Sequence, residues 1–137
     1  MGSTKRWDMM DLRQYLTLQY MTTQVVIDQQ ILPGISQEQM RARPAGGGNS
    51  VAWILWHATR CEDVAINAIV RGAPQVLARP EFAGAAGLGD LRIGTGLSDD
   101  EVASFSASVD GDALLRYRRA VRKETLGWLN SCDLAAL

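Results

Sequence analysis

The sequence predicts an all-α protein, and three stretches carry this prediction. Residues 8–32 contain no proline or glycine and stop at Pro33-Gly34, which is typical of one long helix. Between residues 51 and 71, apolar side chains recur at helical spacing. Ser98 and Glu101 have the spacing of a capping box, which marks the start of a further helix. No stretch has a strand pattern of comparable strength.

The first predicted helix, about residues 8–32, is apolar on two sides. A helix with two apolar sides has more than one neighbour to cover. In a chain of this size the second neighbour could be a partner subunit, and we therefore expect a homodimer. One stripe consists of Leu12, Leu16, Tyr20, Ile27 and Ile31, and the other of Leu18, Met21, Val25 and Leu32.

The second predicted helix spans about residues 51–71. Asn49 or Ser50 can act as its N-cap, and Gly72 has the position of a C′ glycine. A 3.6-residue wheel predicts a clean amphipathic helix with its apolar face toward the core. That face carries Val51, Ile54, Ala58, Cys61, Val64, Ala65, Ala68 and Ile69, and Thr59, Arg60, Asp63 and Asn67 lie opposite.

The stretch 73–97 is rich in glycine and proline, and we interpret it as a long loop over the helices. The expected anchors of this loop are Val76, Leu77, Phe82, Leu88, Leu91 and Ile93. A short helix should follow the capping box, to about Ala107, and a last helix should span about 113–131. Its predicted apolar side consists of Ala113, Leu114, Tyr117, Val121 and Trp128.

Length and composition indicate one ordinary globular domain, residues 1–137. The formal net charge of −1 gives no overall attraction to nucleic acid, and no apolar stretch reaches the roughly 20 residues that a membrane span needs. We expect a cytoplasmic protein without nucleic-acid or membrane partners. The one basic cluster is interpreted as a solvated helix surface; it consists of Arg116, Arg118, Arg119, Arg122 and Lys123.

His57 is the only histidine and is the main candidate for chemistry. An imidazole on an apolar face needs hydrogen-bond partners or a metal ion, and both interpretations remain open. Cys61 lies one turn away, but a cysteine–histidine pair on one helix is weak support for nucleophilic catalysis. Glu62 lies at the edge of the same face, where a carboxylate can reach solvent or pair with an arginine.

The stretch 49–64, Asn-Ser-Val-Ala-Trp-Ile-Leu-Trp-His-Ala-Thr-Arg-Cys-Glu-Asp-Val, resembles the second helix of the DinB-like superfamily. This superfamily includes proteins of the DinB/YfiT type and transferases and isomerases that use mycothiol or bacillithiol. The resemblance implies an up-down four-helix bundle, often dimeric, that binds a divalent metal through three histidines. His57 has the position of the first ligand, and Trp53, Ile54, Cys61 and Val64 would then line the pocket.

The other two family ligands, a His-x-x-x-His pair on the last helix, are absent, because the chain holds one histidine and ends at Leu137. Either these residues are the N-terminal three-helix portion of a longer protein, or the chain is a divergent member that has lost the metal. The resemblance implies a divalent ion (nickel, zinc or manganese), a low-molecular-weight thiol, and a thiol-linked transferase or hydrolase acting on a small molecule. The alternative is a non-catalytic helical module that dimerises or binds a small apolar ligand.

Overall fold

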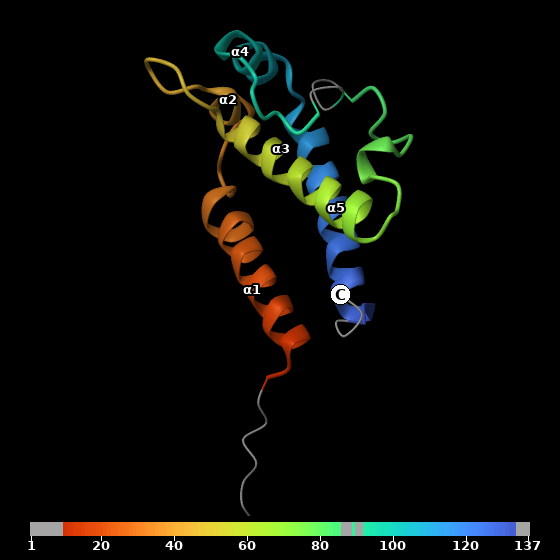
Figure 1. The fold of residues 1–137 in the computed structure, drawn as a ribbon. Helices are drawn as coiled ribbons and strands as arrows, with labels where there is room; N and C mark the ends of the chain where they lie inside the picture. The colour runs from red at the N-terminus through yellow and green to blue at the C-terminus, as the bar shows by residue number, and fades with distance from the viewer. Residues whose placement is uncertain (1–9, 86–88, 90–91, 134–137) are drawn as a thin grey trace, which may run out of the picture. The chain divides into compact units, whose positions relative to one another are not determined.

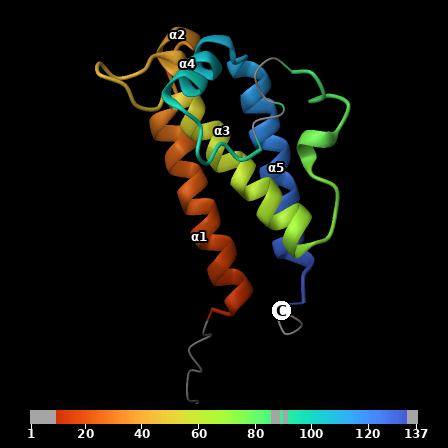
Figure 2. The same ribbon diagram turned by 45° about the horizontal axis from the view of Figure 1, so that its top comes forward.

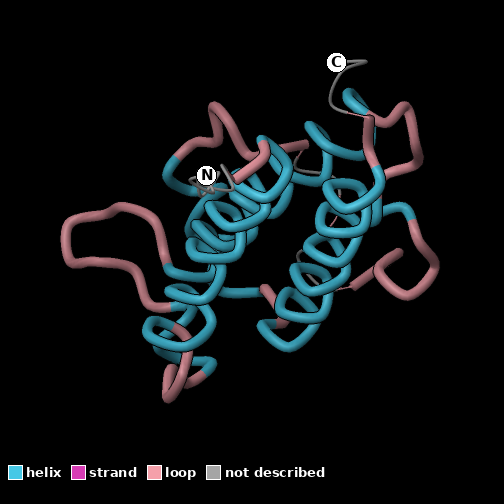
Figure 3. Tube along the Cα trace, turned by 90° about the horizontal axis from the view of Figure 1, so that it is seen from below, coloured by secondary structure: helices cyan, strands magenta, loops and turns pink. Residues whose placement is uncertain are grey.

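The computed structural model describes residues 10–85, 89 and 92–133, and these residues form only helices, turns and loops (Figure 3). The predicted all-α fold class is confirmed. The chain divides into two compact units. One unit holds the chain up to Pro33 together with the residues from Leu126 onward, and the other holds residues 34–125. The prediction of a single domain over 1–137 is not tested by this division.

The first unit contains α1 (Leu12–Val26), which continues as the π-helix η1 (Ile27–Ile31). Asp11 caps α1 by accepting from the backbone N–H of Gln14, whose side chain in turn accepts from the Asp11 backbone N–H. The predicted start near Asp8 lies outside the described residues. Arg13 joins the two parts of this unit by donating to the carbonyls of Asn130, at 2.8 Å, and Cys132.

In the described residues of the second unit, the chain forms five helical elements and most of a sixth (Figures 1 and 2). Within it α3 and α5 lie side by side, and hydrogen bonds join them. The elements are α2 (Gln37–Arg41), α3 (Val51–Glu62), the π-helix η2 (Asp63–Val70), the 3₁₀ turn η3 (Val76–Ala78), α4 (Asp99–Ser108) and α5 (Gly111–Ser131).

Short polar side chains begin several of these helices. Ser98 and Glu101 form the predicted capping box, and Ser50 is the N-cap of α3, as expected. The short helix α2, which precedes α3 in the chain, was not predicted from the sequence. A second capping box, between Ser36 and Gln39, satisfies the free amides at its start and supports a helix of five residues there.

The predicted orientation of helix 51–71 is wrong. Its polar face, defined as Thr59, Arg60, Asp63 and Asn67, is buried, with exposed fractions of 4%, 6%, 0% and 1%. On its predicted apolar face, Ile54, Ala58, Ala65 and Ile69 are exposed, with Ile54 at 52% and Ile69 at 74%, and the other four members are half-buried: Val51, Cys61, Val64 and Ala68. The wheel ranks side chains by hydrophobicity alone, whereas the buried polar groups here satisfy one another's hydrogen bonds.

The expected anchors of the 73–97 loop are partly confirmed. Val76 and Phe82 are buried, Leu77 and Ile93 are half-buried, and Leu88 and Leu91 lie outside the described residues. The predicted apolar side of α5 is buried, as expected, at Ala113, Leu114, Tyr117 and Val121, and Trp128 is half-buried. In the basic cluster, Arg116, Arg119 and Lys123 are exposed as expected, but Arg118 is buried, at 7%. Among the described helices, none combines the length and the apolar character that a membrane span needs.

Candidate metal site

His57 is half-buried on α3, and two neighbours fix its ring. The indole of Trp53, one turn earlier, stacks on the imidazole with ring centroids 4.8 Å apart and planes 13° from parallel. The backbone carbonyl of Ile93 lies 2.5 Å from His57 Nδ1. Because a carbonyl can only accept, Nδ1 carries the proton in the neutral ring, and the lone pair is on Nε2. The side chain therefore has a defined tautomer and a defined orientation.

Gly94 places the Ile93 carbonyl at His57. Its φ of +86° lies in the left-handed region, which glycine adopts without steric cost. A Cβ built on Gly94 would lie 2.5 Å from Cζ3 of Trp56 and 3.4 Å from Cζ2 of Trp53. The backbone thus passes directly over two tryptophans of α3, and only glycine permits that approach.

The thiol of Cys61, one turn further along α3, lies against the ring of His57. Its Sγ lies 3.8 Å from Nε2 and 4.0 Å from Nδ1, which confirms that the two side chains of one helix turn meet. The thiol is free and half-buried. Within the described part of the chain, no group of three or more histidine, cysteine, aspartate or glutamate side chains is placed to hold one ion.

The other residues expected to line the pocket differ in their exposure. Ile54 is exposed, whereas Trp53, Cys61 and Val64 are half-buried. The Nε1 donor of Trp53 is buried and has no acceptor among the residues that the structure describes. Glu62 is half-buried and accepts a hydrogen bond from the hydroxyl of Thr125 on α5, at 2.5 Å.

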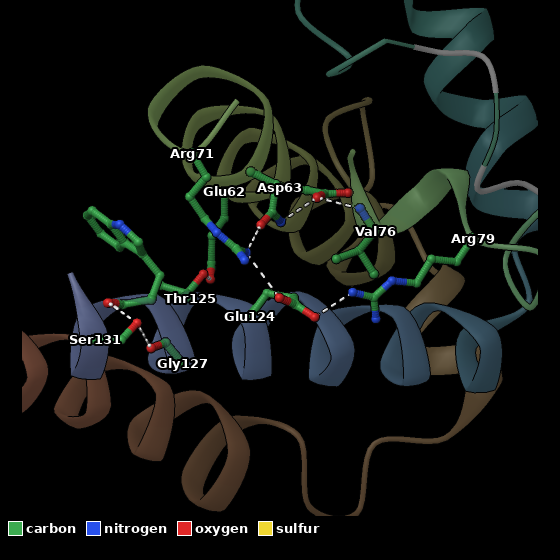
Figure 4. A network of polar contacts seen from close by, with 11 residues as sticks. Glu62, Asp63, Arg71, Val76, Arg79, Glu124, Thr125, Gly127 and Ser131 are labelled. Carbon is green, nitrogen blue, oxygen red and sulfur yellow. Dashed lines mark hydrogen bonds and ion pairs between the residues drawn. The ribbon is translucent and has the colours of Figure 1, made fainter. Parts of the chain in front are cut away.

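An open pocket of about 310 Å³ lies beyond η2, against α5. Arg71 and Arg79 both donate to Glu124, at 3.0 and 2.5 Å (Figure 4). These two arginines hold the pKa of Glu124 below its ordinary value, because they stabilise the charged carboxylate. The pocket is lined by Arg71, Ala73, Pro74, Gln75, Ala78, Arg79 and Glu124.

The polar face of α3 and η2 is organised around Asp63. This carboxylate is fully buried and accepts from the backbone amides of Val76, at 2.8 Å (Figure 4), and Leu77, at 3.0 Å. Asn67 and the hydroxyl of Tyr117 donate to it as well, both at 2.8 Å. Asp63 thus ties the segment after η2 and the helix α5 to the same point.

Arg60 supplies the opposite charge, 3.4 Å from Asp63, and also donates to Tyr117, at 3.1 Å. The Arg60 guanidinium also donates to the side-chain oxygen of Gln75 and to the backbone carbonyl of Arg92, both at 2.9 Å. Burial raises the pKa of Tyr117 far above its ordinary value, so its hydroxyl keeps its proton. We assign this network to structure, because all its members are engaged with one another.

The helical wheel missed this network. A signal did exist, since Arg60, Asp63 and Asn67 are spaced by three and four residues and therefore share one side of a helix. Their partner Tyr117 is 54 residues from Asp63, and no local pattern connects the two. The Ile93 carbonyl is equally invisible in the sequence, because every residue has one.

The comparison with known protein families agrees with the resemblance noted in the α3 sequence. No curated protein matches the chain significantly. The family model of the DinB superfamily matches residues 29–137, which include α2, α3, α4 and α5 and are well over half of the sequence. The chain belongs to the DinB superfamily.

Proposed function

We propose that this chain is a metal-dependent protein, a thiol-linked transferase or a hydrolase acting on a small molecule, with His57 as a metal ligand. One observation carries the proposal: the hydrogen bond between His57 Nδ1 and the Ile93 carbonyl. Histidines that bind metals usually donate their other ring N–H to a carbonyl or carboxylate, which fixes the tautomer and makes the free nitrogen more basic. His57 has this arrangement, and its Nε2 is the available donor atom.

When bound, a divalent ion with an open position lowers the pKa of a coordinated water or thiol and polarises a carbonyl. This chain's own residues hold the imidazole in place through the Trp53 ring and the Ile93 carbonyl. The buried Nε1 donor of Trp53 can hydrogen-bond to an acceptor on a bound small molecule. The proposal includes a low-molecular-weight thiol, which would coordinate as a thiolate.

A single imidazole does not make a catalytic site, which normally has about three protein ligands. The chain has no second histidine. The other ligands would then be supplied by water, by the thiol, or by further polypeptide, which could belong to a longer form of this chain or to a second copy of it. A cytoplasmic location is part of the proposal and is supported by two free cysteines, which are typical of a reducing compartment.

The test is the metal content of untagged protein, measured by elemental mass spectrometry after incubation with nickel, zinc or manganese. We expect near-stoichiometric metal in the wild type and none in His57→Ala. Far-ultraviolet circular dichroism on both proteins serves as the folding control. Absence of metal from the wild type under all three conditions would refute the proposal and leave His57 as a hydrogen-bonded structural residue.

A second candidate function, a non-catalytic helical module, is favoured by a different observation. The apolar face leaves Ile54 and Ile69 exposed, and α1 exposes Leu12, Tyr15 and Leu18. Exposed apolar side chains that gather on one helix side are typical of protein–protein or apolar-ligand contacts. On this basis we expect a homodimer, and sedimentation equilibrium over a hundredfold concentration range tests it. A monomer at every concentration would contradict the homodimer.

A further inference from the structure

The pocket beyond η2 is lined by two arginines that use only part of their donors. Arg71 donates to Asn67 at 2.5 Å and to Glu124 at 3.0 Å, both through Nη1, and Arg79 donates to Glu124 through Nη2. A guanidinium group has five N–H donors. Most donors of both arginines therefore have no acceptor among the described residues, and both side chains line the pocket.

Gln75 adds a neutral donor to the same pocket. Its side-chain oxygen accepts from Arg60 at 2.9 Å, and this contact fixes the orientation of the amide, because a guanidinium group can only donate. The NH2 group of Gln75 is left over, and no acceptor for it lies in the part of the chain that the structure describes. The rest of the lining is apolar, apart from Glu124, and consists of Ala73, Pro74 and Ala78.

Three contacts hold the two guanidinium groups in place before any ligand binds. Glu124 on α5 accepts from both of them, and they reach it from two different segments of the chain (Figure 4). Arg71 is also bonded to Asn67, which itself donates to the buried carboxylate of Asp63. Groups that are already held in position lose less conformational entropy on binding than flexible ones do.

Two guanidinium groups and one carboxylate leave the lining of this pocket with one net positive charge. Arginine binds carboxylate and phosphate groups through parallel hydrogen bonds, and the oxygens of such a group can accept several donors at once. We propose that this pocket binds a small molecule through a phosphate or carboxylate group that accepts from Arg71, Arg79 and Gln75. This inference is independent of the proposed metal site, because the two share no residue.

The size of the pocket fits a ligand larger than the anionic group alone. Its volume of about 310 Å³ lies at the lower end of the range of about 300–1,000 Å³ that is typical of ligand pockets. The apolar side chains of Ala73, Pro74 and Ala78 can contact the uncharged part of such a molecule. The ligand class is therefore a small metabolite that carries an oxyanion group.

The full chain is titrated with inorganic phosphate and, in a separate series, with succinate. Isothermal titration calorimetry measures both at one ionic strength, which is held constant with sodium chloride. We compare wild type with Arg71→Gln, Arg79→Gln and Arg116→Gln, and circular dichroism checks the fold of each. Arg116→Gln is the matched control, because Arg116 is an exposed arginine of α5 that does not line the pocket.

Wild type and Arg116→Gln should bind at least one of the two anions saturably. Affinity should fall by about tenfold or more in Arg71→Gln and in Arg79→Gln, because hydrogen bonds to charged groups usually contribute a factor of that size. Binding of phosphate alone supports a phosphate-bearing ligand, and binding of succinate alone supports a carboxylate-bearing one.

Two results overturn the proposal. One is the absence of saturable binding of either anion to the folded wild type. The other is a loss of affinity in Arg116→Gln equal to that in Arg79→Gln, because binding would then follow overall charge and not the pocket. Neither result bears on the metal content of the protein, so the proposed metal site is tested separately.

Discussion

In the helix formed by α3 and η2, the polar face is buried, whereas the apolar face carries exposed side chains. On the polar face, Asp63 and Asn67 are 0% and 1% exposed, whereas Ile54 and Ile69 on the apolar face are 52% and 74% exposed. Burying a charged group costs several kilocalories per mole unless it is paired and hydrogen-bonded. The buried side of this helix is therefore the one whose polar groups are paired and hydrogen-bonded, and hydrophobicity alone does not determine which side is buried.

Removal of the Asp63 carboxylate is the substitution for which we expect the largest effect, and it tests the difference between the two faces. Asp63→Ala leaves Arg60 as a buried charge without its carboxylate, and the amides of Val76 and Leu77 without their acceptor. We expect a loss of about 3–5 kcal/mol in the free energy of unfolding. Urea denaturation followed by circular dichroism measures it.

The matched control on the apolar face is Ile69→Ala, since Ile69 is 74% exposed. Substitutions at exposed positions usually change stability by less than about 0.5 kcal/mol. Equal losses in Asp63→Ala and Ile69→Ala would contradict the difference between the two faces.

A second prediction concerns the glycine that approaches α3 at its two tryptophans. Gly94 and Gly96 have nearly equal φ values, +86° and +83°, but only at Gly94 would a Cβ collide, 2.5 Å from Trp56. Alanine at either position carries the left-handed cost of about 1–2 kcal/mol. Gly94→Ala should lose about 1–3 kcal/mol more than Gly96→Ala, because of overpacking against the indole.

The stability of both variants is measured by urea denaturation, and the two midpoints are compared with one common m-value for both curves. Since the two positions share their backbone cost, the difference between them isolates the collision with Trp56. A Gly94→Ala protein as stable as Gly96→Ala would mean that this segment moves away from α3 without penalty.

The smallest expected effect concerns Glu124, whose pKa is lowered by Arg71 and Arg79. A carboxylate with a lowered folded-state pKa adds stability above its unfolded pKa of about 4.3, and this stability is lost as the pH falls through the folded value. At pH 7 we expect Glu124→Gln to lose about 1 kcal/mol or less, because the ion pairs are partly exposed.

The difference between wild type and Glu124→Gln should shrink as the pH falls below about 4. Thermal unfolding from pH 3 to pH 7 measures it. The pKa of Glu101, which the Ser98 cap also lowers, affects both proteins equally and cancels. A difference that grows toward acid pH would contradict the sign of the shift.

The starts of the helices could be predicted because their signals are local. Ser98 and Glu101, or Ser50 before α3, satisfy amides within three residues of themselves, and the sequence alone displays that spacing. The burial of Arg60 and Asp63 could not be predicted in this way, because it depends on the Tyr117 hydroxyl, which only the folded chain brings near.

The candidate site shows the same difference between local signals and contacts that only the folded chain makes. His57 and Cys61 were recognisable as neighbours on one helix from their spacing of four residues. The group that orients His57 is a backbone carbonyl 36 residues away, in a loop whose path depends on one glycine. The sequence could therefore identify the two neighbouring side chains, but not the tautomer of His57 that leaves the lone pair on Nε2.

The π-helical segment η2 has a consequence for the spacing of features along this helix. Its closing bond runs from the Arg71 amide to the Ile66 carbonyl, five residues back, so its turns hold more residues than those of α3. A deletion of one residue in η2 could be absorbed by rewinding to an α-helix. His57 and Cys61 before η2 and Arg71 after it would then all keep their sides of the helix, because a π-helical turn holds about one residue more than an α-helical turn. η2 thus accommodates an additional residue without changing which side of the helix the residues before and after it occupy.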